Sequence, residues 1–65
     1  MLDQIGILAE QIWHYLKKNG ETNVTKLPHV FAEKEFIIYA ALGWLAREGK
    51  VDLLLKGKIK IAKIK

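Results

Sequence analysis

The chain has 65 residues, a net charge of +4 and 51% hydrophobic residues, and it contains no cysteine. This length allows one small domain over residues 1–65, which excludes most enzymes, and the absence of cysteine excludes a disulfide framework. No apolar run approaches the ~20 residues of a membrane span and no signal-peptide layout opens the chain, so the composition predicts a soluble, cytoplasmic protein.

The basic residues are concentrated in the last quarter of the chain. Residues 1–49 carry five cations against six anions, whereas residues 50–65 carry six lysines against Asp52 alone. Ten of the eleven cations are lysine, which is a point charge suited to phosphates, while arginine is the residue that usually reads a guanine edge. If the chain binds nucleic acid, this composition favours contact with the backbone over base readout.

The first segment has the periodicity of an amphipathic helix. At about 100° per residue, one apolar stripe collects Leu2, Ile5, Leu8, Ala9, Ile12, Trp13 and Leu16. Asn19-Gly20 follows as a stop signal, because glycine tolerates the left-handed conformation that ends helices. The pattern predicts a helix that ends at this pair.

A second, shorter helix is predicted next, with Thr25 as its cap and Pro28 at its third position, where a missing N–H costs nothing. The i, i+3, i+4 spacing predicts an inner face of Leu27, Val30 and Phe31. Residues 22–24 are predicted to form a short extended piece before this helix.

The third helix is predicted over Glu33 to Glu48, with Gly49 just past its end. Its apolar residues cover almost the whole circumference, and only a narrow strip through Tyr39, Gly43 and Arg47 interrupts them. A helix of this kind is normally buried on more than one side. In so short a chain, the side not covered by the other helices must meet the hairpin, a partner or water.

From Lys50 the apolar period changes to two, which predicts a β-hairpin that turns at Gly57. A three-residue loop that pairs Leu55 with Ile59 would place one apolar set on a single inward face: Val51, Leu53, Leu55, Ile59 and Ile61. In this register Leu54 lies on the outer face beside Lys60. The alternation slips at residues 62–64, which indicates a bulge or the end of the strand.

Two stretches of this sequence resemble a known family. Residues 40–51 (AALGWLAREGKV), and residues 12–16 (IWHYL) followed by 19–21 (NGE), are similar to small stand-alone winged helix-turn-helix proteins of bacteria and archaea with unknown function. The resemblance implies an α+β winged helix-turn-helix fold, with three helices followed by a two-stranded β-hairpin wing, and a homodimer. It implies no activity. Pro28 departs from the family pattern and leaves the boundary of the second helix open.

In winged helices generally, the third helix enters the major groove and the wing touches an adjacent minor groove or phosphates. Carried over by position, the candidate nucleic-acid-binding residues are Lys34, Tyr39 and Arg47 of the third helix with Lys56, Lys58, Lys60 and Lys63 of the wing. The third helix has a net charge of −1 and offers apolar groups and carboxylates, which argues against base reading. The wing lysines are the better candidates for phosphate contact.

The wing lysines also have a structural interpretation. Lysines along an exposed strand keep a sheet edge from pairing with other chains, and a lysine-rich, cysteine-free composition fits a thermophile without any ligand. Two apolar features favour a homodimer: apolar residues cover almost the whole circumference of the third helix, and Leu54 points outward from the hairpin. The candidate interface residues are Trp44, Ile37 and Leu54.

Catalysis and metal binding find little support in these residues. The chain has no serine or cysteine nucleophile and no glycine-rich phosphate loop. His14 and His29 have no second ligand at a suitable spacing, so neither a metal nor a cofactor is expected.

Two functional hypotheses follow. The first is a small DNA-binding protein, a transcriptional regulator that holds DNA mainly through its lysine-rich wing. The alternative is a homodimeric winged-helix module for protein interaction that does not bind DNA. The fold cannot choose between them, because winged helices serve both roles.

Overall fold

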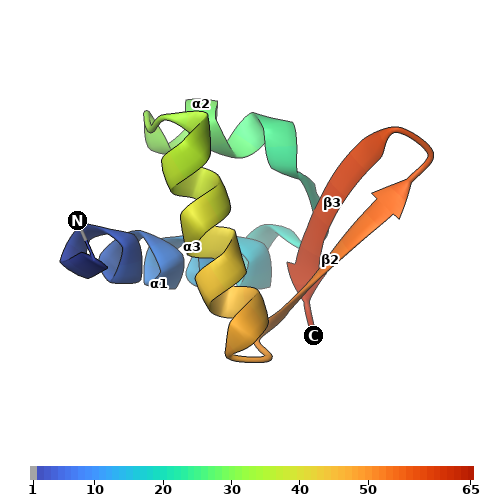
Figure 1. Ribbon diagram of the computed structural model, residues 1–65. Helices are drawn as coiled ribbons and strands as arrows, with labels where there is room; N and C mark the ends of the chain where they lie inside the picture. The colour runs from blue at the N-terminus through green and yellow to red at the C-terminus, as the bar shows by residue number, and fades with distance from the viewer. Residues whose placement is uncertain (1) are drawn as a thin grey trace.

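The computed structural model describes residues 2–65, in which three α-helices precede a long hairpin (Figure 1). In chain order the elements are α1 (Leu2–Asn19), β1 (Thr22–Asn23), the 3-10 helix η1 (Val24–Lys26), α2 (Leu27–Phe31), α3 (Glu35–Arg47), β2 (Val51–Lys56) and β3 (Ile59–Ile64). The strands form one antiparallel sheet in the order β1-β3-β2. This confirms the predicted α+β winged-helix order, with β1 as a third strand where the short extended piece was expected. None of the helices within residues 2–65 is long and apolar enough to cross a membrane.

Helix α1 follows its predicted apolar stripe. Leu8, Ala9, Ile12 and Leu16 are buried, and Trp13 packs against them from the edge of the stripe. The helix ends where Gly20 takes a φ of 79° and donates its N–H to the carbonyl oxygen of Leu16 at 2.8 Å.

The start of the second helical segment differs from the prediction. Asn23, not Thr25, is the cap: its side-chain oxygen accepts hydrogen bonds from the backbone N–H of Thr25 at 3.0 Å and from the Thr25 hydroxyl at 2.7 Å. An asparagine side chain reaches the backbone two residues on, so the segment starts as η1. Pro28 lies in the first turn of α2, where its missing N–H leaves no helical bond unmade.

Helix α2 is too short to present the predicted inner face. Over its five residues Leu27 is fully buried and Phe31 packs edge-on against Tyr15, but Val30 is 41% exposed. The chain then reverses at Ala32, which takes a left-handed φ of 51°. Residue 34 is extended, so α3 begins at Glu35 and not at Glu33.

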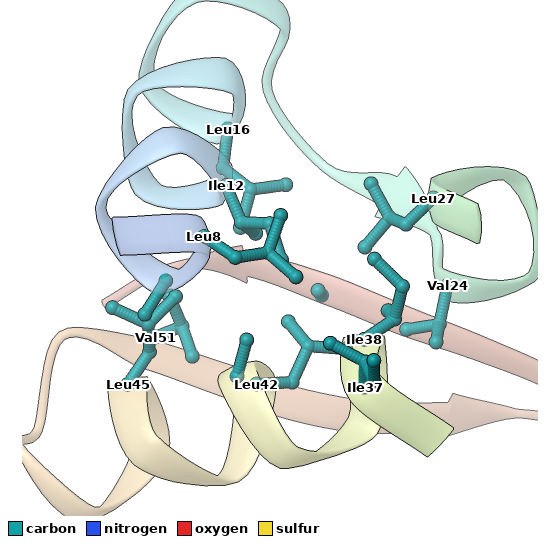
Figure 2. Packing of buried hydrophobic residues seen from close by; sticks show 13 residues of the cluster. Leu8, Ile12, Leu16, Val24, Leu27, Ile37, Ile38, Leu42, Leu45 and Val51 are labelled. Atoms are coloured by element: carbon teal, nitrogen blue, oxygen red, sulfur yellow. The ribbon is translucent and has the colours of Figure 1, made fainter. Parts of the chain in front are cut away.

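One face of α3 forms the centre of the core (Figure 2). Its buried residues meet Leu8 and Ile12 of α1, Leu27 of α2 and Val51 of β2. They are Ile37, Ile38, Ala41, Leu42 and Leu45. The opposite face, which includes Phe36, Ala40 and Trp44, is exposed. The chain therefore covers this nearly all-apolar helix on one side only.

The wing has a register one residue away from the predicted one. The loop contains two residues, Gly57 and Lys58, and Gly57 takes a φ of 65°, as the first position of a type II′ turn requires. Lys56 therefore pairs with Ile59 and Leu54 pairs with Ile61.

This register changes what lies on each face of the wing. One face carries Val51, Leu53 and Leu55 with Lys60, Ala62 and Ile64, and Lys60 bonds to α3, so this is the helix side. Leu54 therefore lies beside Ile61 and not beside Lys60. Pairing continues through Ile64 without a bulge. The change of phase at residues 62–64 is therefore not a bulge: Ile59 and Ile61 lie on one face of β3, and Ala62 and Ile64 lie on the other.

Shortening the fully buried Ile38 to valine tests the core assignment. We expect Ile38→Val to lower the free energy of unfolding by about 1 kcal/mol, because it removes one buried methylene and leaves a small cavity. Chemical denaturation at fixed protein concentration measures the change. The same substitution at exposed Ile7 of α1 is the control, and an equal loss there would contradict the assignment.

Candidate interaction face of α3 and the wing

The exposed side of α3 carries few groups able to read a base edge. Phe36 is 60% exposed, and Tyr39, Ala40 and Gly43 continue the same stripe at helical spacing. Arg47 lies at the end of the helix and is the one arginine of the chain. Most of this stripe is therefore apolar or aromatic.

A shallow apolar hollow of about 250 Å³ lies between α3 and the wing. Helix α3 contributes Tyr39, Leu42 and Gly43, and the middle of β2 contributes three consecutive leucines. These leucines, Leu53, Leu54 and Leu55, are all exposed. Leu53 and Leu55 point to the helix side of the sheet and Leu54 points to the other side, so the three leucines surround the open edge of β2. We call the surface formed by Tyr39, Gly43 and these three leucines the α3–β2 face. Leu55, the second-last residue of β2, is the most exposed of the three, at 72%.

Lys60 is the one charged residue that lines this hollow. Its ammonium group donates a hydrogen bond to the Tyr39 hydroxyl at 3.2 Å and lies 5.3 Å from the centre of the Tyr39 ring. The hydrogen bond and the charge interaction with Tyr39 raise the pKa of Lys60. Tyr39 and Lys60 thus bind each other across the hollow, although the sequence suggested two independent contacts to nucleic acid.

A second hollow, of about 550 Å³, lies on the other side of Gly43, between α3 and the start of α1. Trp44 and Arg47 line it together with Leu2 and Ile5. The Trp44 ring lies against Gly6, where an added Cβ would be only 3.6 Å from the ring. Part of Trp44 therefore packs in the contact between α1 and α3, and 39% of the residue remains exposed.

At the wing, three of the four lysines have acidic neighbours, since the charge of Glu35 also acts on Lys60. Lys56 forms an ion pair with Glu21 at 2.7 Å, which joins the outer strand to the segment before β1. That hydrogen bond holds the pKa of Glu21 below its usual value, with further help from the charges of Lys56 and Lys63. Lys63 also lies opposite Asp52 in the ladder. Lys58 is in the exposed turn at the tip of the wing.

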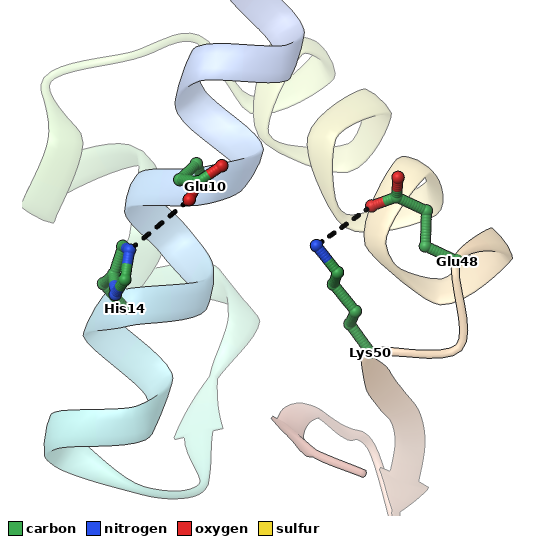
Figure 3. Close-up of polar contacts among 4 residues, drawn as sticks. All are labelled: Glu10, His14, Glu48 and Lys50. Carbon is green, nitrogen blue, oxygen red and sulfur yellow. Dashed lines mark ion pairs between the residues drawn. The ribbon is translucent and has the colours of Figure 1, made fainter.

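Lysines also gather at the base of the sheet, beyond the residues singled out from the sequence. Lys17 and Lys50 place their ammonium groups 4.5 and 5.1 Å from the centre of the Trp13 ring. Figure 3 shows the second partner of Lys50, a carboxylate oxygen of Glu48 at 3.7 Å. The other pair in that view, Glu10 and His14, lies on the exposed side of α1 at 3.5 Å.

The predicted residues therefore do not form one site. Lys34 is extended and exposed just before α3 and Arg47 is the last residue of that helix, so the length of α3 separates the two. Among the three candidate interface residues, Trp44 and Leu54 are exposed, but Ile37 is only 8% exposed. Ile37 lies in the core, because it shares one face of α3 with Ile38, Ala41, Leu42 and Leu45, which packs against the rest of the domain.

Leu53 and Leu55 were missed as candidates for an exposed face. The predicted hairpin register placed both on a fully inward face, whereas the helices cover only the first part of β2. Their adjacency to Leu54 is the signal that could have identified them, because three consecutive leucines in a strand cannot all point inward. Within residues 2–65, no three His, Cys, Asp or Glu side chains lie close enough to hold a metal ion.

Comparison with known proteins agrees with this architecture. Residues 1–63 match the model of a protein family described as a winged helix-turn-helix domain, DUF2582. The chain belongs to this family. An uncharacterized protein of Methanocaldococcus jannaschii, MJ1608, is 32% identical over 68 residues, and the match covers 100% of this chain and 96% of the relative. No solved structure gives a significant match.

The contact between Glu21 and Lys56 predicts a titration that can be measured directly. Lys56→Gln should bring the pKa of Glu21 back towards the usual glutamate value, because it removes the nearest positive charge and leaves at most a weaker, neutral hydrogen bond to the carboxylate. Any stability that this pair contributes is fully present when the pH is above the usual pKa of a glutamate. It is lost as the pH falls through the lowered pKa of Glu21 in the folded protein. Carbon NMR of the Glu21 carboxyl across an acid titration measures the shift. Lys58→Gln is the matched control and should leave this pKa unchanged.

Proposed function

We propose that this chain is a binding protein and not an enzyme: a winged-helix module that self-associates as a homodimer through its α3–β2 face. The observation that carries the proposal is the exposure of Leu53, Leu54 and Leu55 beside an apolar hollow under α3. Contiguous exposed apolar surface of this kind is rare on monomers and is typical of interaction sites. A second copy presents the same apolar surface in a two-fold symmetric contact.

The chemistry of this face favours protein over DNA. A helix that reads the major groove presents donors such as arginine, lysine, asparagine or glutamine to base edges. On α3 the corresponding positions hold Phe36, Ala40 and Gly43, and Tyr39 is already bonded to Lys60. Apolar side chains of this size remain energetically favourable only when another surface removes them from water.

The oligomeric state tests this proposal. We expect the wild-type chain to be a dimer at micromolar concentration by light scattering or sedimentation. Leu53→Glu should shift it to monomer, because the substitution places a charge in the middle of the proposed contact. Far-ultraviolet circular dichroism should remain that of a folded domain.

Ile7→Glu is the matched control, since Ile7 is a more exposed apolar residue on α1, outside the α3–β2 face. This variant should remain a dimer. A wild-type monomer would contradict the proposal, and loss of the dimer in Ile7→Glu alone would move the interface to the side of Trp44.

A second candidate function, contact with DNA phosphates, is favoured by the charge at the wing. Lys58 lies at the tip, where Figure 1 shows the hairpin extending away from the helices. Lysines placed in this way can bind the phosphate backbone without reading sequence. This role is compatible with the homodimer, because Lys58 lies in the turn and outside the α3–β2 face.

Salt-dependent binding to duplex DNA of arbitrary sequence tests the second candidate. Binding should weaken steeply with salt, with a log–log slope of about −0.9 for each neutralised phosphate. Replacing Lys58 and Lys60 by alanine should flatten the slope by up to about two units.

Lys17→Ala/Lys18→Ala removes the same charge from the end of α1 and should leave the wing's contribution intact. If the wild-type chain does not bind duplex DNA at low salt, the phosphate-binding role is wrong and the protein-interaction role stands alone.

A further inference from the structure

Strand β2 lies at an edge of the sheet, because the strand order is β1-β3-β2. Only one side of its backbone is occupied by a neighbouring strand within residues 2–65. An edge strand offers unpaired N–H and C=O groups to any other strand, and natural proteins usually protect it with proline, a bulge, charged residues or a covering segment. β2 has no proline and pairs with β3 without a bulge.

The hydrogen-bond pattern shows which residues of β2 face the open edge. The N–H of Lys65 donates to the carbonyl oxygen of Lys50 at 3.1 Å, which extends the β2–β3 ladder by one pair. In an antiparallel ladder, every second residue directs its backbone groups to the same neighbour. The even-numbered residues of β2 therefore bond to β3, and Leu53 and Leu55 direct their N–H and C=O groups to the open edge.

Resting on the homodimer proposed above, we infer that β2 pairs antiparallel with β2 of a second copy, about a two-fold axis that passes through Leu54. The two sheets then join into one continuous sheet across the dimer. In this register each Leu53 lies opposite the second copy's Leu55 and exchanges both backbone hydrogen bonds with it. Each Asp52 lies opposite the second copy's Lys56, so the two charged residues that flank the leucines are paired.

The neighbouring symmetric registers are less favourable. An axis through Leu53 places Lys50 opposite Lys56 and Asp52 opposite Leu54. An axis through Leu55 places Leu54 opposite Lys56. Opposite charges across a strand pair stabilise it and like charges destabilise it, so the sequence Asp-Leu-Leu-Leu-Lys at residues 52–56 is self-complementary only about Leu54.

The register also accounts for the exposure of Leu55. On the helix side of the joined sheet, the second copy's Leu55 would lie beside Leu53, at the rim of the hollow that Tyr39 and Gly43 line. This removes from water the most exposed large apolar residue of the wing. Lys56 keeps its bond to Glu21, and the second copy's Asp52 adds another carboxylate to it.

Engineered cysteines test this register, since the chain has no cysteine of its own. Two Leu54 residues on the axis form a non-hydrogen-bonded pair with Cα atoms about 4.5 Å apart, within the range that a disulfide bridges. Leu54→Cys should therefore oxidise to a covalent dimer, visible on a non-reducing gel. Leu55→Cys is the control: it is more exposed, but its two Cα atoms would be about 8 Å apart in this register, too far for a bridge.

The outcomes of this experiment are distinct. A bridge in Leu55→Cys or Leu53→Cys but not in Leu54→Cys would overturn the register. If none of the three bridges while light scattering still finds a dimer, the strand pairing is wrong, and the homodimer forms by contact between α3–β2 faces without a joined sheet. A wild-type monomer overturns both the homodimer and the strand pairing.

A charge swap supplies a second test that needs no disulfide. Asp52→Lys and Lys56→Glu each create two like-charge pairs in their own homodimer, so each should dimerise about 3- to 30-fold more weakly than the wild type. Mixed together, the two variants form a heterodimer in which both pairs are of opposite charge, and affinity should return. If each variant is folded but the mixture does not regain the dimerisation affinity of the wild type, Asp52 does not pair with Lys56.

Discussion

The packing of one face of α3 against α1 is the contact on which the rest of the structure depends. Ile38, Leu42 and Leu45 are fully buried there and face Leu8 and Ile12 of the first helix. A 65-residue chain has too little surface to cover a second face of α3, so the burial of one side leaves the other side in water. The apolar residues on that second side are thus a consequence of how the core forms, and they give the domain a surface to be covered by a partner.

The wing depends on a smaller constraint, the two-residue turn at Gly57. With Gly57 and Lys58 in the loop, each residue of β2 takes a partner one place further along β3 than a three-residue loop would give. A shift of one residue exchanges the two faces of a strand. This shift places Lys60 on the face of the sheet that meets α3, where Lys60 bonds to Tyr39. Leu54 lies beside Ile61 on the opposite face of the sheet.

The electrostatics of the domain are local, although the net charge is +4. Lys56 is paired with Glu21, Lys60 is bonded to Tyr39, and Lys50 lies near Glu48. Exposed contacts like these add little to stability. The two ion pairs reduce the charge that a phosphate backbone would meet, whereas the bond to the Tyr39 hydroxyl leaves the charge of Lys60 in place. Lys58, in the exposed turn at the tip, forms no ion pair within residues 2–65, and among the candidate wing lysines it is the one best placed for an anionic ligand.

The sequence alone determined the order of elements and the fold. The stripe on α1, the stop at Gly20 and the change of period after Lys50 are local signals, because they depend on the backbone preferences of a few neighbouring residues. Tertiary structure decided which apolar residues remain exposed. Val30 and Ile37 exchanged their expected environments: the short α2 leaves Val30 exposed, and Ile37 lies on the face of α3 that packs into the core. Leu53 and Leu55 became a candidate interface because the helices cover only the first part of β2, and no local pattern encodes how far a helix layer extends over a strand.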